Sequence, residues 1–199
     1  MTLQALWSGN ESSHAEQTDL VERLRTGELA AVGEAYDRHH EQVRRFARRL
    51  LGDESVAEDL VQETFLTLPR AVKRFEGRSS LRTFLVSIAA NHSRHHVRSA
   101  QRRRSAMDKA AHEEVAPGHS SSSANPEHEL QRRQMAALLN HCLDQLSHDH
   151  RLVFILCEVE DYTSTKASEV LDVPEGTVRT RLMHAKKKLR SLLEKEGAR

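Results

Sequence analysis

Basic and hydroxyl side chains gather in one segment near the end of the chain, VPEGTVRTRLMHAKKKL at residues 173–189. Those that could contact a nucleic acid are Thr177, Arg179, Thr180, Arg181, His184 and Lys187. An arginine can donate two hydrogen bonds to the edge of guanine, whereas a lysine more often binds a phosphate. The apolar residues of the segment recur at the spacing of one buried helix stripe: Val178, Leu182, Ala185 and Leu189. The pattern predicts a DNA-binding helix, although an ordinary solvated basic face has the same composition.

A shorter helix is predicted just before this basic helix. Either Thr163 or Ser164 can cap its start, and apolar residues follow at helical spacing, namely Ala167, Val170 and Leu171. Residues 172–174 then interrupt the helix, because a proline disfavours helical geometry in the residue before it. The basic helix opens near Glu175, whose charge suits the positive end of the helix dipole. Two helices around a tight turn, with the second one basic, predict a helix-turn-helix.

The chain has 13 histidines, which raise the possibility of a metal site. His92, His95 and His96 are spaced so that two or three imidazoles could share one helix face, as metal ligands often do. No carboxylate or cysteine completes such a site nearby in the sequence, so we predict no metal. The sequence also lacks a nucleophile elbow, a glycine-rich phosphate loop and an HExxH motif. We therefore predict no catalytic residue, no cofactor and no enzymatic activity.

Two cysteines, Cys142 and Cys157, lie in apolar, helix-like contexts without CxxC spacing. They predict buried thiols in a reducing compartment, and a redox pair is the alternative. Neither a membrane-spanning apolar run nor a signal-peptide pattern occurs, so we expect a cytoplasmic protein that does not insert into a membrane.

The composition predicts an all-α fold. Of the 199 residues 30% are charged and only 4% are aromatic. Helical spacing is predicted from Thr18 to a break at residues 52–53, again from residue 55, and again over residues 81–104. Pro69 should kink or end the middle helix near Leu68, which leaves its continuation to Phe75 open. The net charge is only +1, so any DNA affinity must come from local clusters.

A serine-rich stretch with two prolines, VAPGHSSSSANPEHE, divides the chain. We predict a disordered tail at residues 1–17, a helical domain at 18–104, a flexible linker at 105–126 and a second helical domain at 127–199. Each of the two small helical domains carries basic residues. This arrangement suits a two-point grip on a long polymer.

Two motifs, AEDLVQETFL at residues 57–66 and VPEGTVRTRLMHAKKKL, resemble signatures of the extracytoplasmic-function (ECF) sigma factors of the sigma-70 family. The resemblance spans about Thr18 to Leu193. It implies a subunit that directs core RNA polymerase to promoters and initiates transcription. The first domain would be region 2, which binds polymerase and minus-10 DNA, and the second would be region 4, which binds minus-35 DNA. The resemblance also implies an anti-sigma factor as a further partner.

Site residues follow from the same resemblance. The polymerase-binding residues would be Asp59, Leu60, Gln62 and Glu63. The residues that bind duplex minus-10 DNA and its melted non-template strand would be Arg74, Gly77, Arg78, Ser80, Arg82, Asn91, Arg94 and Arg98. The basic helix would bind the minus-35 element through the residues named above. By spacing alone the polymerase-binding set is equally an ordinary solvated acidic face.

Two other functions remain open at this point. A free-standing helix-turn-helix regulator would bind an operator tightly without polymerase, usually as a dimer. A histidine-based metalloprotein would bind metal in a fixed ratio and lose its function with a chelator.

Overall fold

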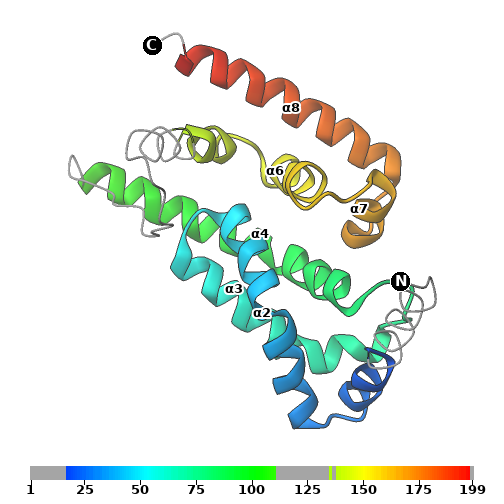
Figure 1. The fold of residues 1–199 in the computed structure, drawn as a ribbon. Helices are drawn as coiled ribbons and strands as arrows, with labels where there is room; N and C mark the ends of the chain where they lie inside the picture. The colour runs from blue at the N-terminus through cyan, green and yellow to red at the C-terminus, as the bar shows by residue number, and fades with distance from the viewer. Residues whose placement is uncertain (1–16, 111–134, 136–137, 198–199) are drawn as a thin grey trace, which may run out of the picture. The chain divides into compact units, whose positions relative to one another are not determined.

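The computed structural model describes residues 17–110, residue 135 and residues 138–197. No strand occurs in these ranges, so the all-α prediction is confirmed (Figure 1). The chain divides into two compact helical units, residues 1–96 and 97–199, and the division falls inside one long helix. The predicted tail lies outside the described residues apart from Gln17.

The first unit contains a helix over residues 17–25, then α2 (Leu29–Leu51), α3 (Glu54–Ala71), a short 3-10 turn η1 (Val72–Arg74) and the start of α4 (Leu81–Ala110). The break predicted between α2 and α3 is confirmed. Gly52 adopts a left-handed φ of 67° and donates its N–H to the Arg48 carbonyl at 2.8 Å. Asp53 then caps α3, because its carboxylate accepts the Val56 N–H at 3.0 Å.

The core of the first unit lies where α2 and α3 pack together. The apolar residues of α3 that recur at helical spacing are all buried: Val56, Leu60, Val61, Phe65 and Leu68. On α2 two large apolar side chains face solvent instead. Leu29 is 83% exposed and Tyr36 is 40% exposed, whereas Ala31 and Ala35 are buried. The helix period carries the buried stripe from Val43 back to these two alanines, so the larger side chains are turned outward.

Pro69 does not end α3, so of the two outcomes expected near Leu68, a kink or an end, the end does not occur. The helix continues to Ala71 and passes into η1, where Phe75 donates its N–H to the Val72 carbonyl at 3.0 Å. Pro69 lies in the last turn of α3, so the Phe65 carbonyl, four residues earlier, loses its helical donor and is crowded by the proline ring. Leu68 and Val72 are fully buried and Phe75 is 6% exposed, so packing on both sides of Pro69 keeps the segment helical.

Helix α4 is longer than predicted. It continues to Ala110, so the first residues of the predicted linker are helical, and the rest of that linker lies outside the described residues. The second unit then contains helical residues 138–144, α6 (His148–Phe154), a π-helical stretch η2 (Ile155–Val159), α7 (Ser164–Leu171) and α8 (Glu175–Gly197). The domain boundaries themselves stay a prediction.

The core of the second unit is built on α6 and α8. Val178, Ala185 and Leu189 of α8 are buried as predicted, and Leu182 is half-buried. Arg151 of α6 is also buried, with 3% of its side chain exposed, and its guanidinium pairs with the Asp144 carboxylate.

The free thiols of Cys142 and Cys157 are buried and half-buried, and this burial raises the pKa of both.

Candidate nucleic-acid interface

The predicted helix-turn-helix is present in the second unit, and local hydrogen bonds explain its shape. The Thr163 hydroxyl accepts the Lys166 N–H at 3.1 Å and so caps α7. Of the two predicted caps, Thr163 and Ser164, the first is therefore the one used. Asp172 ends α7 in the left-handed region with a φ of 51°. The chain then turns at Pro174, whose carbonyl accepts the Thr177 and Val178 N–H groups at 2.9 and 3.3 Å. Helix α8 packs against both α6 and α7 through its apolar stripe.

The face of α8 opposite this stripe carries exposed basic and polar residues. Arg179, Thr180, His184 and Lys187 all lie there. The Arg179 side chain is 71% exposed and contacts Glu175 one turn earlier at 2.5 Å. The Thr180 hydroxyl donates to the Gly176 carbonyl at 2.9 Å. These four predicted residues therefore form one accessible surface, called the front of α8 below, whereas Thr177 is half-buried at its edge.

Three other basic residues of α8, Arg181, Lys186 and Lys188, are paired with the body of the unit. Arg181 Nη2 lies 2.8 Å from Asp149 Oδ2 on α6, and the Arg181 side chain is only 26% exposed. On the other flank Lys186 Nζ lies 2.8 Å from Glu158 Oε1. Lys188 Nζ donates to the Gln145 carbonyl at 2.5 Å. Arg181 therefore lies beside the front of α8, with its Nη2 held by Asp149.

A second imidazole lies behind His184. The rings of His150 on α6 and His184 are 6.1 Å apart between centroids and tilted by 32°. Burial lowers the pKa of His150, and the neighbouring His184, Arg181 and Lys188 lower it further, against the opposing effect of Asp149. Since its neutral form is favoured, His150 adds little positive charge to this side of α8.

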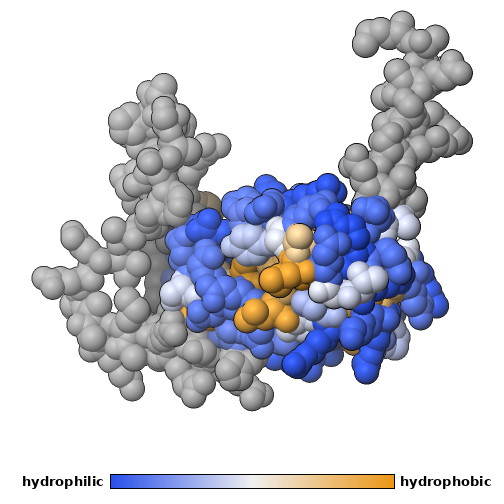
Figure 2. All heavy atoms as spheres, turned by 90° about the horizontal axis from the view of Figure 1, so that it is seen from below, coloured by the Kyte–Doolittle hydropathy of each residue, from blue (hydrophilic) through white to orange (hydrophobic). Residues whose placement is uncertain are grey.

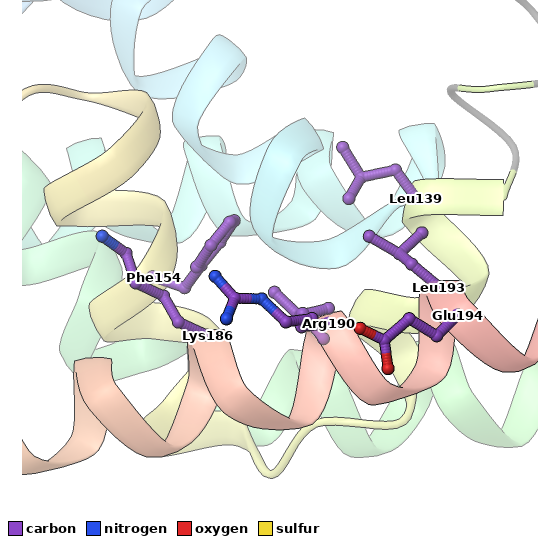
Figure 3. Close-up of a pocket in the computed structure, with 7 residues that line it drawn as sticks. Leu139, Phe154, Lys186, Arg190, Leu193 and Glu194 are labelled. Atoms are coloured by element: carbon purple, nitrogen blue, oxygen red, sulfur yellow. The ribbon is translucent and has the colours of Figure 1, made fainter.

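A groove runs beside α8, away from its front. Its volume is about 610 Å³, and the side chains that line it are Leu139, Phe154, Lys186, Leu189, Arg190, Leu193 and Glu194 (Figure 3). A second hollow of about 460 Å³ adjoins Arg179 and Lys187 and is lined in part by Met183, which is 58% exposed. Leu139, which lines the first groove, is also 38% exposed.

In the first unit, the predicted minus-10 residues begin at the end of η1 with Arg74. They continue through the loop with Gly77, Arg78 and Ser80 and reach Arg82 at the start of α4. Arg74, Arg78 and Arg82 are exposed, and Arg78 pairs with Glu76 at 2.5 Å. Gly77 has a φ of 74°, which explains why a glycine is needed there. Ser80 has a structural task of its own, because its hydroxyl oxygen accepts the Thr83 N–H at 3.2 Å at the start of α4.

Helix α4 presents Asn91 and Arg94 to solvent, in the same unit as this loop. The Arg98 backbone is helical, and its side chain lies outside the described residues. The buried side of α4 includes Leu85 and Ile88, as predicted, whereas Phe84 is half-buried and stacks at a tilt on Phe75, 4.7 Å between centroids. The exposed residues of the loop and of α4 are thus held by a packed apolar base.

The predicted polymerase-binding residues do not all lie at the surface. Asp59 and Gln62 are exposed, and Glu63 is half-buried. Leu60 is a correction: its side chain is fully buried in the core of the first unit and offers no surface to a partner. Leu66, which the sequence analysis did not select, is 79% exposed. Leu66 follows Gln62 by four residues and Asp59 by seven, so it lies on the same side of α3. This helical spacing could have identified Leu66 from the sequence.

Apolar side chains reach the surface elsewhere too. Figure 2 shows one face on which they form a patch surrounded by hydrophilic residues. Among the described residues, the large apolar side chains that are exposed are Leu29, Tyr36, Leu66, Met135, Leu139 and Met183. Within the same part of the chain, no helix is both long and apolar enough to cross a membrane.

The histidine cluster differs from the sequence expectation. A carboxylate does come near, because Glu63 bonds to both His92 and His96. Even so, no group of three or more His, Cys, Asp or Glu side chains in the described ranges is arranged to hold a metal ion. The His95 side chain lies outside those ranges.

Comparison with known proteins accounts for both units. Residues 35–103 match the family model described as Sigma-70 region 2, and residues 136–189 match the one described as Sigma-70, region 4. RNA polymerase sigma factor CarQ of Myxococcus xanthus is 32% identical over 173 residues, which cover 87% of this chain and 95% of that protein. The ECF RNA polymerase sigma-E factor of Haemophilus influenzae is 26% identical over 179 residues, 88% and 94% of the two chains. The solved structure of the Bartonella quintana sigma factor RpoE with the anti-sigma factor NepR is 25% identical, with a TM-score of 0.55 over 78% of this chain and 91% of that chain.

Proposed function

The chain belongs to the extracytoplasmic-function group of the sigma-70 family, and we propose that its two helical units share the work of a sigma factor between them. As a sigma factor, the protein directs core RNA polymerase to promoters and initiates transcription there. Residues 18–104 would act as region 2 and residues 127–199 as region 4. The linker between them would let the two units contact DNA elements that are far apart.

The front of α8 would read the minus-35 element. A helix of this kind fits the major groove, where base edges differ in their hydrogen-bonding groups. Arg179, Thr180 and His184 are the exposed residues that could reach bases, and Lys187 would bind a phosphate. Arg181 would join them only after leaving Asp149. The packing of α8 on α6 and α7 supports this assignment, because it leaves that one face open.

The loop and the exposed side of α4 would bind the minus-10 element. Arg74, Arg78 and Arg82 would hold phosphates of the melted non-template strand, and Gly77 would allow a close approach of the backbone. Asn91 and Arg94 would face the same DNA, with Arg98 one turn further along α4. Ser80 would contribute mainly by fixing the start of α4.

The polymerase face would consist of Asp59, Gln62 and Leu66 on α3. A charged and a polar side chain beside an exposed leucine are typical of a protein interface, where an apolar anchor is surrounded by polar contacts. Core polymerase would carry out RNA synthesis, and this chain would supply no catalytic group of its own. We place it in the cytoplasm, where bacterial polymerase acts.

An anti-sigma factor would complete the list of partners. The Bartonella quintana relative was crystallised with such an inhibitor. A family member held by an anti-sigma factor is released when a signal removes that inhibitor. Neither region matched in this chain is a sensor domain, so the inhibitor would supply the regulation.

One observation carries the proposal: matches to region 2 and region 4 occur in order on one chain, and each falls on a unit that exposes basic residues. Run-off transcription with core bacterial polymerase on a genomic promoter library tests it. We expect discrete new start sites with the protein, and their loss when Asp59, Gln62 and Leu66 are replaced together. Glu22→Ala, an exposed change on the helix at residues 17–25, should leave the starts in place. Tight operator binding without polymerase, and no new starts, would instead indicate a free-standing regulator.

A further inference from the structure

The Glu63 carboxylate joins α3 to α4 through two imidazoles. Its Oε1 lies 3.0 Å from His92 Nδ1, and its Oε2 lies 2.6 Å from His96 Nε2. On the other side of the His92 ring, Nε2 lies 3.2 Å from the Thr67 hydroxyl of α3. Both oxygens of one carboxylate therefore bond to α4, and both nitrogens of one imidazole bond to α3.

The direction of these bonds follows from the groups involved. An ionised carboxylate only accepts, so His92 Nδ1 and His96 Nε2 donate to Glu63. In a neutral His92 ring with its proton on Nδ1, Nε2 accepts a hydrogen bond from the Thr67 hydroxyl. The arrangement thus works without a charged imidazole. The His96 side chain is only 11% exposed, so water competes weakly for its bond.

The spacing of the two histidines gives the contact a geometric consequence. His92 and His96 lie one turn apart on the same side of α4. A single bond to α4 would leave the helix free to roll about that point, whereas two bonds one turn apart resist both rolling and sliding. In the sequence Asn91 precedes His92 and Arg94 lies between the two histidines, and both side chains are exposed on α4. The bonds that fix the histidines therefore also set where Asn91 and Arg94 face.

On α3, Glu63 borders the proposed polymerase face. It follows Gln62, which is exposed, and it is itself half-buried toward α4. We propose that Glu63 is a positioning residue: it holds the DNA-facing side of α4 in a fixed orientation relative to the polymerase face of α3. This inference rests on the proposed function, and it gives Glu63 a different task from the direct polymerase contact that the family resemblance implies.

The proposal separates two steps of initiation. Loss of the Glu63 contacts leaves Asp59, Gln62 and Leu66 able to bind polymerase, because their surface lies on α3. Promoter opening depends on Asn91 and Arg94 meeting the DNA in the correct orientation, because positional errors of about 1 Å weaken such contacts strongly. Core binding and promoter opening should therefore respond differently to the same substitution.

The experiment uses full-length protein and core polymerase and compares three variants: Glu63→Ala, the isosteric Glu63→Gln, and His92→Gln with His96→Gln. The dissociation constant for core is measured without DNA, and the rate of promoter opening is measured with a fluorescent base in the minus-10 element. We expect opening to slow by about tenfold in all three, since each removes charge-assisted hydrogen bonds. Core affinity should stay within about twofold of wild type. Combining Glu63→Ala with the two histidine changes should slow promoter opening no further, because all these substitutions remove the same set of hydrogen bonds.

Other outcomes would overturn the inference. If both Glu63 variants weaken core binding as much as Asp59→Ala does, and the histidine variant opens promoters at the wild-type rate, Glu63 is a polymerase contact. Additive losses from the glutamate and histidine changes would also exclude a shared positioning role. Glu22→Gln, which removes an exposed carboxylate from the helix at residues 17–25, is the matched control and should match wild type in both measurements. Failure of the wild-type protein to initiate at all would instead refute the proposed function.

Discussion

Arg181 on α8 and Asp149 on α6 form an ion pair with 2.8 Å between Nη2 and Oδ2, at the edge of the exposed basic front of α8. The pair places a negative charge beside a surface proposed to bind DNA, and it holds back one of the arginines expected to reach it. It thus acts against non-specific attraction to phosphates, which depends mainly on the number of available cations.

Asp149→Asn should therefore strengthen DNA binding. The substitution removes one negative charge and frees Arg181, so we expect the affinity for any duplex to rise by roughly three- to tenfold at low salt. The slope of log affinity against log salt should steepen by about one, because one more counterion is released. Fluorescence anisotropy over a range of salt concentrations measures both. Asp149→Asn with Arg181→Ala is the control, and equal slopes for Asp149→Asn and wild type would contradict the prediction.

The buried pair of Arg151 and Asp144 should matter for stability. Asp144→Ala would leave the Arg151 guanidinium in the core with only 3% of the side chain exposed. We expect the free energy of unfolding of the second unit to fall by about 2–4 kcal/mol, toward the lower part of the range for breaking a buried pair, because Asp144 is itself 25% exposed. Hydrogen exchange of the α6 and α8 amides in urea would measure it.

An exposed pair provides the comparison for that measurement. Arg78 and Glu76 lie 2.5 Å apart, and their side chains are 84% and 63% exposed. Water and salt screen such a pair, so Glu76→Ala should change the stability of the first unit by less than about 1 kcal/mol. Equal effects of the two substitutions would show that the burial of Arg151 has no energetic role.

His39 should make the first unit sensitive to acid. Burial lowers its pKa, and the charges of Arg38 and Arg82 lower it further. The unfolded chain binds a proton near the ordinary pKa of 6.5, whereas the folded unit binds it only at lower pH. The contribution of neutral His39 to the stability of the first unit is therefore fully present above pH 6.5, and it is lost as the pH falls from there through the lower pKa of the folded unit. His39→Gln should reduce this loss, as measured by urea titrations at several pH values with the amide NMR signals of α2. An unchanged pH dependence would show that His39 is not responsible.

The sequence predicted the local features of this protein well, because they depend on short-range rules. The period of Val178, Ala185 and Leu189 identified the buried side of α8, and Thr163 was one of two predicted caps for α7. Pro69 was different, because the burial of residues on both sides of it outweighed the local preference to end α3.

Contacts between helices could not be predicted in the same way. The spacing of Arg181 on its own helix says nothing about Asp149, which comes from α6. For the same reason the prediction of Glu63 as an exposed polymerase-binding residue did not include its bonds to His92 and His96 of α4. Leu60 was assigned to the polymerase face with its motif, although the helical period of α3 places it with the buried residues, as the structure shows. A single sequence carries periodicity within a helix, but not the pairing of one helix with another.

Arg179 and Lys187 should differ in how they contribute to promoter recognition. Both are exposed on the front of α8, two turns apart along one side of the helix. Arginine can bond to guanine through two donors, so Arg179→Ala should reduce affinity for the preferred minus-35 sequence by about 1–3 kcal/mol and relax the preference at one base pair. Lys187→Ala should weaken binding to all sequences alike and reduce the salt slope by about one. Binding to a library of randomised duplexes, at two salt concentrations, distinguishes these effects.

Lys195→Ala, further along α8 and also exposed, should change neither quantity. If Arg179→Ala also weakens all sequences equally, Arg179 binds a phosphate, and sequence reading must come from Thr180, His184 or the shape of the DNA.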